Sequence, residues 1–304
     1  MDRQKVLAIV GPTGIGKTSL SVWLAKQLNG EIISCDSMQV YKKMDVGTAK
    51  VTKEEMQDIH HELIDVQNYN EPYNVKVFQE KCRTAIEDVV KRGKFPILCG
   101  GTGLYLKAAL YDYEFQEENE DIAYTTFLNS KTNEELVAML KEKDEKALEK
   151  IHPNNRKRLI RALQICHSGT SKSEQEDKQQ HIPLYDVYFL GLDVDRDILH
   201  DRINKRVDIM FENGLVKEVE DLFTNPETWE YTSFQGIGYK EFKDYFLKEK
   251  SIDEVKTAIK THSRQYAKRQ YTWFKNQMPV HWFEAQNRDE IYSEVKEWLM
   301  DEDK

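Results

Sequence analysis

One short segment near the amino terminus limits the fold more than any other part of this 304-residue chain. It reads Gly11-Pro12-Thr13-Gly14-Ile15-Gly16-Lys17-Thr18, with an apolar run before it at residues 6–10 and helical composition after it at 19–28. A buried strand, a glycine-rich turn and a helix start aim backbone N–H groups at one point, which suits two adjacent phosphates. We therefore predict a phosphate site at which Lys17 adds positive charge and the Thr18 hydroxyl ligates Mg²⁺.

Strand-like and helical patterns alternate along the chain and predict an α/β fold, a P-loop NTPase-like doubly wound parallel sheet. Strands are expected at 5–10, 31–35, 95–99, 187–194 and 280–283, and helices at 19–28, 74–91, 195–213, 215–223, 251–276 and 289–300. An acidic stretch with helical composition at 131–150, followed by a mobile loop at 168–180, interrupts this alternation. We predict a catalytic core of residues 1–111 and 181–304 around a mainly helical insertion domain at 112–180.

Cysteine spacing and hydropathy argue against several classes of protein. The four cysteines are far apart and form no C-x-x-C pair, so neither a disulfide framework nor a zinc site is expected. No apolar run approaches the roughly 20 residues that cross a bilayer, and the amino terminus does not resemble a signal peptide. We expect a cytoplasmic protein without membrane contact.

The distribution of charge indicates a polyanionic partner, although the net charge is −9. Residues 151–170 contain Arg156, Lys157, Arg158 and Arg161 without any acidic residue. Residues 255–283 likewise contain no acid, and their basic residues are Lys256, Lys260, Arg264, Lys268, Arg269 and Lys275. Two basic segments on an acidic chain predict a localised site for a polyanion.

Two further strand ends place polar groups near the predicted phosphate site, because the carboxyl ends of parallel strands meet at one edge. Asp36 follows one strand, where it could hold magnesium, act as a general base, or cap a turn. Gly100-Gly101-Thr102-Gly103 follows another strand. Its small residues would let a ligand approach the backbone and Thr102 could donate to a diphosphate oxygen, or the segment could be only a turn.

On these and other motifs the chain resembles the tRNA dimethylallyltransferase (tRNA isopentenyltransferase) family, bacterial type. The matching motifs are the glycine-rich segment 11–18, Asp36-Ser37-Met38-Gln39-Val40-Tyr41, residues 44–50, 100–105, 151–156 and 206–215, Ile237-Gly238-Tyr239-Lys240-Glu241, and Arg264-Gln265-Tyr266-Ala267-Lys268-Arg269-Gln270 with Trp273-Phe274. The segments beginning at Asp36 and at Ala267 are the specific ones. Two departures are Glu62, within His60-His61-Glu62-Leu63, and an insertion that is short for the family.

The resemblance implies transfer of a dimethylallyl group from dimethylallyl diphosphate to the exocyclic N6 amine of the adenine 3′-adjacent to the anticodon of tRNA, with release of diphosphate. Asp36 would be the base, Thr102 and Arg206 the other catalytic residues, and segment 11–18 with Mg²⁺ would hold the diphosphate. The adenine would be flipped out of the anticodon loop. The implied tRNA-binding residues are Asp36, Ser37, Met38, Gln39, Thr102, Lys157, Arg158, Leu159, Ile160, Arg161, Arg264 and Lys268. The implied protein is a monomer.

Two other functions fit parts of the same pattern. A small-molecule or nucleoside kinase would use ATP at the glycine-rich segment and Asp36 as the base for a substrate hydroxyl. That function would favour an acid where Gly100 stands. An RNA-binding NTPase switch would account for the basic segments but not for Gln39 beside Asp36.

Overall fold

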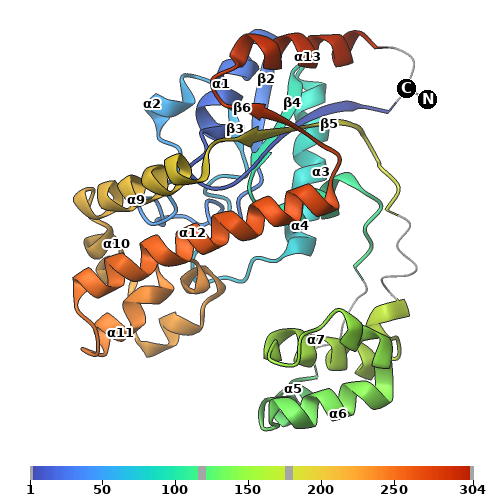
Figure 1. The fold of residues 1–304 in the computed structure, drawn as a ribbon, viewed down its shortest axis with the longest axis vertical. Coiled ribbons are helices and arrows are strands. Elements are labelled where there is room, and N and C mark those ends of the chain that lie inside the picture. Colours follow the sequence, from blue (N-terminus) through green and yellow to red (C-terminus); the bar gives the residue numbers. More distant parts are fainter. Residues whose placement is uncertain (1–2, 116–120, 175–180, 302–304) are drawn as a thin grey trace. The chain divides into compact units, whose positions relative to one another are not determined.

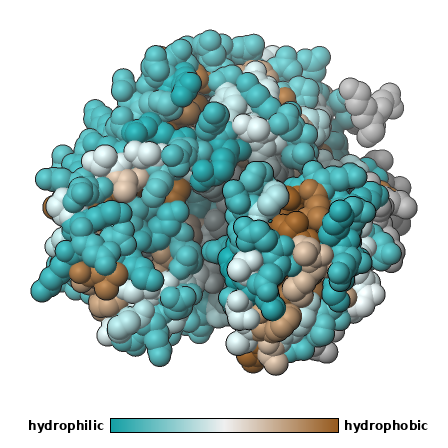
Figure 2. Space-filling view, turned by 60° about the horizontal axis from the view of Figure 1, so that its bottom comes forward, coloured by the Kyte–Doolittle hydropathy of each residue, from teal (hydrophilic) through white to brown (hydrophobic). Residues whose placement is uncertain are grey.

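The structure, a computed structural model, describes residues 3–115, 121–174 and 181–301. The chain divides into two compact units: unit 1 comprises residues 1–111 and 183–304, and unit 2 comprises residues 112–182. Within the described ranges, no helix combines the length and the apolar character that crossing a bilayer requires. Figure 2 shows one face, on which hydrophilic residues predominate and hydrophobic residues form a few separate patches.

Unit 1 is built on a six-stranded parallel sheet with the strand order β3-β2-β4-β1-β5-β6. The strands are β1 (Lys5–Val10), β2 (Gly30–Ser34), β3 (His61–Glu62), β4 (Phe95–Gly100), β5 (Asp186–Asp193) and β6 (Val280–Glu284). The central strand β1 pairs with β4 and β5, and Ile9 lies opposite Cys99 and Leu190. Both faces of this strand are covered, which explains why it is apolar from Val6 to Val10.

Helices cover both faces of the sheet (Figure 1). The helices of unit 1 are α1 (Lys17–Leu28), α2 (Lys53–Met56), α3 (Val75–Lys91), α4 (Gly103–Leu110), α9 (Arg196–Glu212), α10 (Leu215–Leu222), α11 (Lys243–Phe246), α12 (Ile252–Gln277) and α13 (Arg288–Met300). Three short 3-10 helices lie between α10 and α11: Pro226–Glu230, Thr232–Gln235 and Lys240–Phe242. The side chains of β1 alternate between two cores: Val6 and Ala8 pack in the core that includes α3 and α4, and Leu7 and Ile9 in the core that includes α1 and α13. The long helix α12 packs against α9 and α4.

The predicted α/β fold with a parallel sheet is confirmed, and the differences from expectation are local. Strand β3 was not predicted, because two residues are too few to show an alternating pattern. The helix expected over 131–150 is interrupted: α6 (Asn133–Asp144) gives way to a 3-10 helix, Glu145–Glu149. Asp144 causes the change, because its side chain accepts a hydrogen bond from the backbone N–H of Ala147 and so starts a new turn.

Unit 2 is a small helical unit with its own hydrophobic core. Its helices are α5 (Ile122–Asn129), α6 and α7 (Arg156–His167), and Leu128, Leu140 and Leu163 are among the fully buried side chains at its centre. Of the loop expected at 168–180, residues 172–174 are helical, and residues 175–180 lie outside the described part of the chain. Arg156 binds inside the unit, since its guanidinium donates to the Asn129 carbonyl at 2.9 Å and to Asn133 Oδ1 at 3.1 Å.

Replacing Arg156 by Met should destabilise unit 2 by about 1–2 kcal/mol, because carbonyl groups at the end of α5 lose a charged donor. Faster hydrogen exchange of the amides in α5 and α7 would report the loss. Arg158→Met is the matched control, because Arg158 lies on the same helix and its side chain is exposed. Equal exchange rates in the two variants would contradict this role for Arg156.

Candidate active site

The glycine-rich segment forms a tight turn between β1 and α1. Gly16 is the N-cap of α1 in a left-handed conformation, with φ of 106°, and offers no side chain to occupy the first N–H groups of the helix. Helix α9 packs closely on the turn: a Cβ added at Gly14 would lie 3.1 Å from a side-chain carbon of Ile203. The helix start therefore has the geometry that an anion requires. Thr18, the predicted metal ligand, is exposed in the first turn of α1.

Lys17 folds back over its own turn. Its Nζ donates to the carbonyl oxygens of Gly11 at 2.9 Å and of Pro12 at 2.8 Å. Burial lowers the pKa of Lys17 to about 8, and the charge of the neighbouring Arg206 acts in the same direction. A phosphate group would replace two neutral acceptors by a charged one and restore the full positive charge.

Arg206, on α9, is the second cation at this turn. Its Nη1 donates to Thr13 Oγ1 at 3.2 Å and its Nη2 to the Ala49 carbonyl at 3.3 Å. Burial lowers the pKa of Arg206, whereas the Asp36 carboxylate opposes that shift. No carboxylate in the described ranges forms an ion pair with Arg206. Both cations at the turn thus donate only to neutral oxygens, which leaves their charge available to an anion.

Asp36 lies just beyond the carboxyl end of β2, and its two oxygens differ in their hydrogen bonds. Oδ1 accepts hydrogen bonds from the backbone N–H groups of Met38 at 2.8 Å and of Gln39 at 3.3 Å. Oδ2 accepts no hydrogen bond from any residue that the structure describes, and Asp36 lines both cavities described below. The capping role considered for Asp36 is therefore present, and it leaves one oxygen for chemistry.

Gln270 joins two loops of the site and was missed by the sequence analysis. It is buried on α12, where its Oε1 accepts from the Thr13 N–H at 2.9 Å and its Nε2 donates to the Gly101 carbonyl at 2.9 Å. A Cβ at Gly101 would collide with the amide nitrogen of Gln270, which explains the glycine. Thr102 is the N-cap of α4 and lies near the side chain of Tyr266 of α12. The motif at 267–270 gave the only signal for Gln270, and it carried no indication of a contact.

Two cavities lie side by side at this site and share several lining residues. The first, of about 660 Å³, is lined by the glycine-rich turn, by residues after β2 and β4, and by α9. The second, of about 390 Å³, is lined by Ser37, Met38, Tyr73, Tyr105 and parts of α9 and α12. The residues that line both are Thr13, Asp36, Arg206, Met210 and Tyr266. Asp36 and Arg206 therefore stand where a ligand in one cavity would meet a ligand in the other.

The predicted RNA-binding residues lie in three places. Ser37 and Met38 line the second cavity and Gln39 lines the first, where its Nε2 donates to the Ala49 carbonyl at 3.3 Å. On α12, Lys268 is exposed, whereas the half-buried Arg264 hydrogen-bonds to Asn204 and Thr261.

The third group is on α7 of unit 2. Lys157, Arg158 and Arg161 are exposed there, and Ile160 is half-buried. Leu159 is fully buried and packs in the core of the unit, so its side chain does not reach the surface.

Two lysines of the basic row on α12 already have a partner. Asp208 of α9 binds Lys256 at 2.6 Å and Lys260 at 2.7 Å, and these contacts lower the pKa of Asp208. Spacing along α12 could not reveal this, because the acid belongs to another helix. The uncompensated charge on α12 is correspondingly smaller than the sequence suggested.

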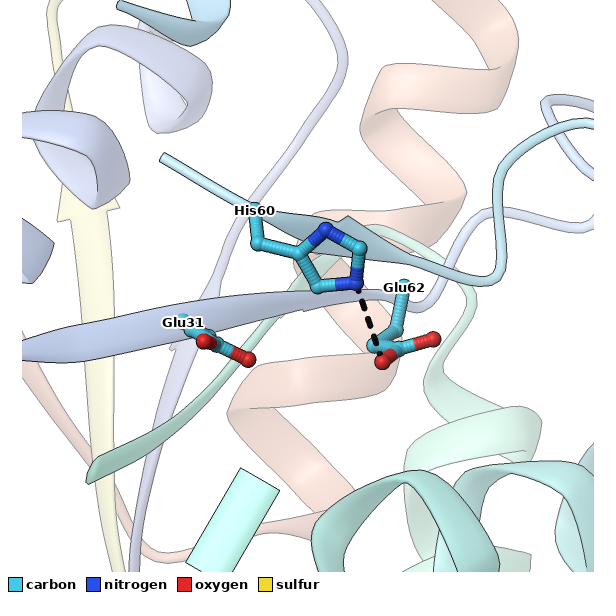
Figure 3. A group of neighbouring side chains, drawn as sticks. All are labelled: Glu31, His60 and Glu62. Atoms are coloured by element: carbon cyan, nitrogen blue, oxygen red, sulfur yellow. Dashed lines mark hydrogen bonds and ion pairs between the residues drawn. The ribbon is translucent and has the colours of Figure 1, made fainter. Parts of the chain in front are cut away.

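Three potential metal ligands meet at one edge of the sheet, namely Glu31, His60 and Glu62 (Figure 3). His60 Nε2 lies 3.1 Å from Glu62 Oε1. Arg92 binds both carboxylates, since its Nη2 is 2.6 Å from Glu31 Oε2 and 2.8 Å from Glu62 Oε1. The guanidinium offsets part of the negative charge of the two carboxylates, so this group forms an ion-pair network. It also gives Glu62, a departure from the family pattern, a structural partner.

The chain is similar to proteins of one known family. Residues 39–277 match the family model described as IPP transferase. A tRNA dimethylallyltransferase of Bacillus anthracis is 48% identical to the chain, over 98% of this chain and 96% of its own.

Solved structures are also similar. A tRNA delta(2)-isopentenylpyrophosphate transferase of Staphylococcus epidermidis is 40% identical with a TM-score of 0.72, and covers 97% of this chain and 100% of its own. A eukaryotic dimethylallyltransferase acting on tRNA is 31% identical with a TM-score of 0.82, and covers 98% of this chain and 78% of its own. With the family model, these matches establish that the chain belongs to the tRNA dimethylallyltransferase family.

Proposed function

We propose that the chain transfers a dimethylallyl group from dimethylallyl diphosphate to the exocyclic N6 amine of the adenine 3′-adjacent to the anticodon in tRNA, releasing diphosphate. One observation carries the proposal: among the described residues, Lys17 and Arg206 donate only to neutral oxygens of the glycine-rich turn and of Ala49, and the Oδ2 of the nearby Asp36 accepts no hydrogen bond. Two cations suit a diphosphate, and a carboxylate at the boundary of two cavities suits the removal of a proton from an acceptor.

The glycine-rich turn would hold the donor in the first cavity. Backbone N–H groups at the start of α1, together with Lys17 and Arg206, would bind the diphosphate oxygens and stabilise their charge as the C–O bond breaks. The exposed Thr18 hydroxyl lines this cavity and would hold Mg²⁺, which when bound neutralises part of the diphosphate charge. Thr102 lies near Tyr266, and Tyr266 lines both cavities.

Asp36 would activate the acceptor. An adenine amine is a weak nucleophile, because its lone pair is delocalised into the ring. As its nitrogen forms a bond to the allylic carbon, the C–O bond to diphosphate breaks and a proton passes from N6 to Asp36 Oδ2. Because Oδ1 is fixed by the N–H groups of Met38 and Gln39, the free oxygen has a defined direction.

The tRNA would reach this site through its anticodon loop. The adenine must leave its stack to approach Asp36, since the carboxylate lies within the cavities, and enzymes that act on bases generally use such flipping. Ser37, Met38 and Gln39 would surround the base, and Arg264 with Lys268 would contact phosphates. In unit 2, the insertion that we assign to tRNA binding, Lys157, Arg158 and Arg161 would do the same. We further propose that the protein acts as a cytoplasmic monomer.

A direct test is to incubate the protein with tRNA and with dimethylallyl diphosphate that carries a label in the allyl group, beside a parallel reaction with γ-labelled ATP. Label transferred to tRNA from the prenyl donor supports the proposal. Label transferred only from ATP would contradict it and support a kinase.

Asp36→Asn should lower kcat by about 10²–10⁴-fold while the Kd for tRNA changes little. The amide oxygen still accepts from Met38 and Gln39, so the turn keeps its shape while the proton acceptor and its negative charge are lost. Single-turnover transfer and filter binding measure the two quantities. Asp58→Asn is the control, because Asp58 is exposed and its positive φ of 63° suits asparagine. An Asp36→Asn enzyme as active as the control would leave Asp36 with the capping role alone.

Binding of dimethylallyl diphosphate should take up protons near pH 8. The free site holds Lys17 at a pKa of about 8, and the bound anion favours the charged amine and raises that pKa. Uptake occurs between the two pKa values, so affinity should fall as the pH rises above about 8. Calorimetry in two buffers of different ionisation enthalpy measures the protons. Lys17→Arg stays charged and should lose this uptake, and equal uptake in both proteins would rule out Lys17 as its source.

Replacing Lys157, Arg158 and Lys268 together by Gln should raise the Kd for tRNA. The slope of log affinity against log salt should become shallower by about 0.7–0.9 per lost phosphate contact. Lys256→Gln is the matched control, because Lys256 is bound to Asp208. The control should change the slope less than any one of the three. A triple variant with the wild-type slope would show that tRNA phosphates bind elsewhere.

A further inference from the structure

One carboxylate outside both cavities binds four donors. Glu218, on α10, accepts from the backbone N–H groups of Asp45 and Val46, each at 2.7 Å, and of Gly47 at 2.9 Å. It also accepts from the hydroxyl of Tyr239 at 2.7 Å. Hydrogen bonds to a charged acceptor are stronger than neutral ones, and four on one carboxylate fix the backbone that donates them.

The backbone that Glu218 holds belongs to a loop in the walls of both cavities. Asp45, Val46 and Ala49 line the first cavity, and Gly47 and Thr48 line the second. Two residues farther along, the Ala49 carbonyl accepts from Arg206 and from Gln39. The loop 45–49 therefore connects Glu218 to the guanidinium and to the amide that face the ligands.

Loop 45–49 packs tightly against the side chain of Tyr239. Its ring is fully buried, and a Cβ added at Gly47 would lie 2.5 Å from it, so the loop rests directly on the ring. A Cβ at Gly238 would lie 2.9 Å from the Gly47 carbonyl oxygen, so the backbone at Gly238 also lies close to this loop.

Glu241 anchors the turn that carries Tyr239. It accepts from the Gly238 N–H at 2.9 Å and contacts His262 of α12 at 2.7 Å. The motif at 237–241, to which no role has been given so far, is thus the support for the loop.

We propose that Glu218 is a positioning residue for prenyl transfer. By holding the N–H groups of residues 45–47, it sets the position of the Ala49 carbonyl, and that carbonyl orients the guanidinium of Arg206 and the amide of Gln39. Glu218 touches neither ligand and acts only through the loop. The inference rests on the proposed function, because Arg206 and Gln39 matter here as groups that bind the donor and the base.

A positioning role of Glu218 and a purely stabilising role predict different kinetics for the same variant. Glu218→Gln puts an NH₂ group beside backbone N–H donors, so part of the loop loses its acceptor while α10 keeps its length. If Glu218 is a positioning residue, the Glu218→Gln variant should have a kcat about 10–100-fold lower than the wild type. Its KM for tRNA should change by less than about threefold. Glu220→Gln, an exposed position two residues along the same helix, should match the wild type in both.

Hydrogen exchange gives a readout that does not need activity. In Glu218→Gln the amides of residues 45–47 should exchange faster, while those of α1 and β1 keep their wild-type rates. Tyr239→Phe removes one of the four donors and should give a smaller change of the same kind. If Glu218→Gln does not fold, Tyr239→Phe carries the test with the same expected signs. Unchanged exchange at 45–47 would overturn the inference.

A double-mutant cycle separates positioning through Arg206 from an independent effect. If Glu218 acts through Arg206, Glu218→Gln should cost far less in an Arg206→Gln protein than in the wild type. Full additivity of the two losses in kcat would overturn the inference. Failure of the proposed function would be visible separately, since the wild type would then transfer no prenyl group to tRNA.

Discussion

Lys17 and Arg206, which form no ion pair with any carboxylate that the structure describes, depend on neutral oxygens that the rest of unit 1 holds in place. Taking a charge out of water is costly; carbonyls of the glycine-rich turn stabilise Lys17, and Thr13 of that turn with Ala49 of loop 45–49 stabilises Arg206. Those oxygens stay in place because β1, α9 and α12 hold the turn from three sides. The parallel sheet is the frame that makes such an arrangement possible, since it brings the ends of β1, β2 and β4 to the same edge.

In the proposed function, Asp36 satisfies a structural and a chemical requirement with one side chain. Its capping oxygen explains why the sequence alone left several roles open, because a turn cap and a general base have the same residue type at the same place. The two roles use different oxygens of one carboxylate. The cap also limits rotation of the side chain, so the structural role supports the chemical one.

The sequence predicted those features that depend on neighbours along the chain. Strand β1 and the turn after it were located correctly because apolar runs, glycines and Lys17 lie in one continuous segment. Features made by distant residues were missed. Gln270 contacts Thr13 from the other end of the chain, and Asp208 neutralises lysines on another helix. Such pairs have no local spacing that could reveal them, and only the fold brings them together.

The two hydrogen bonds of Gln270 restrict which residue types can occupy position 270. It needs an acceptor toward Thr13 and a donor toward Gly101, and a primary amide supplies both from one side chain in one orientation. A glutamate of the same length would set a carboxylate against the Gly101 carbonyl and repel an incoming diphosphate. A lysine or arginine would leave the Thr13 N–H without an acceptor. The residue that links these two loops beside Lys17 and Arg206 is therefore a neutral amide, which accepts one hydrogen bond and donates another.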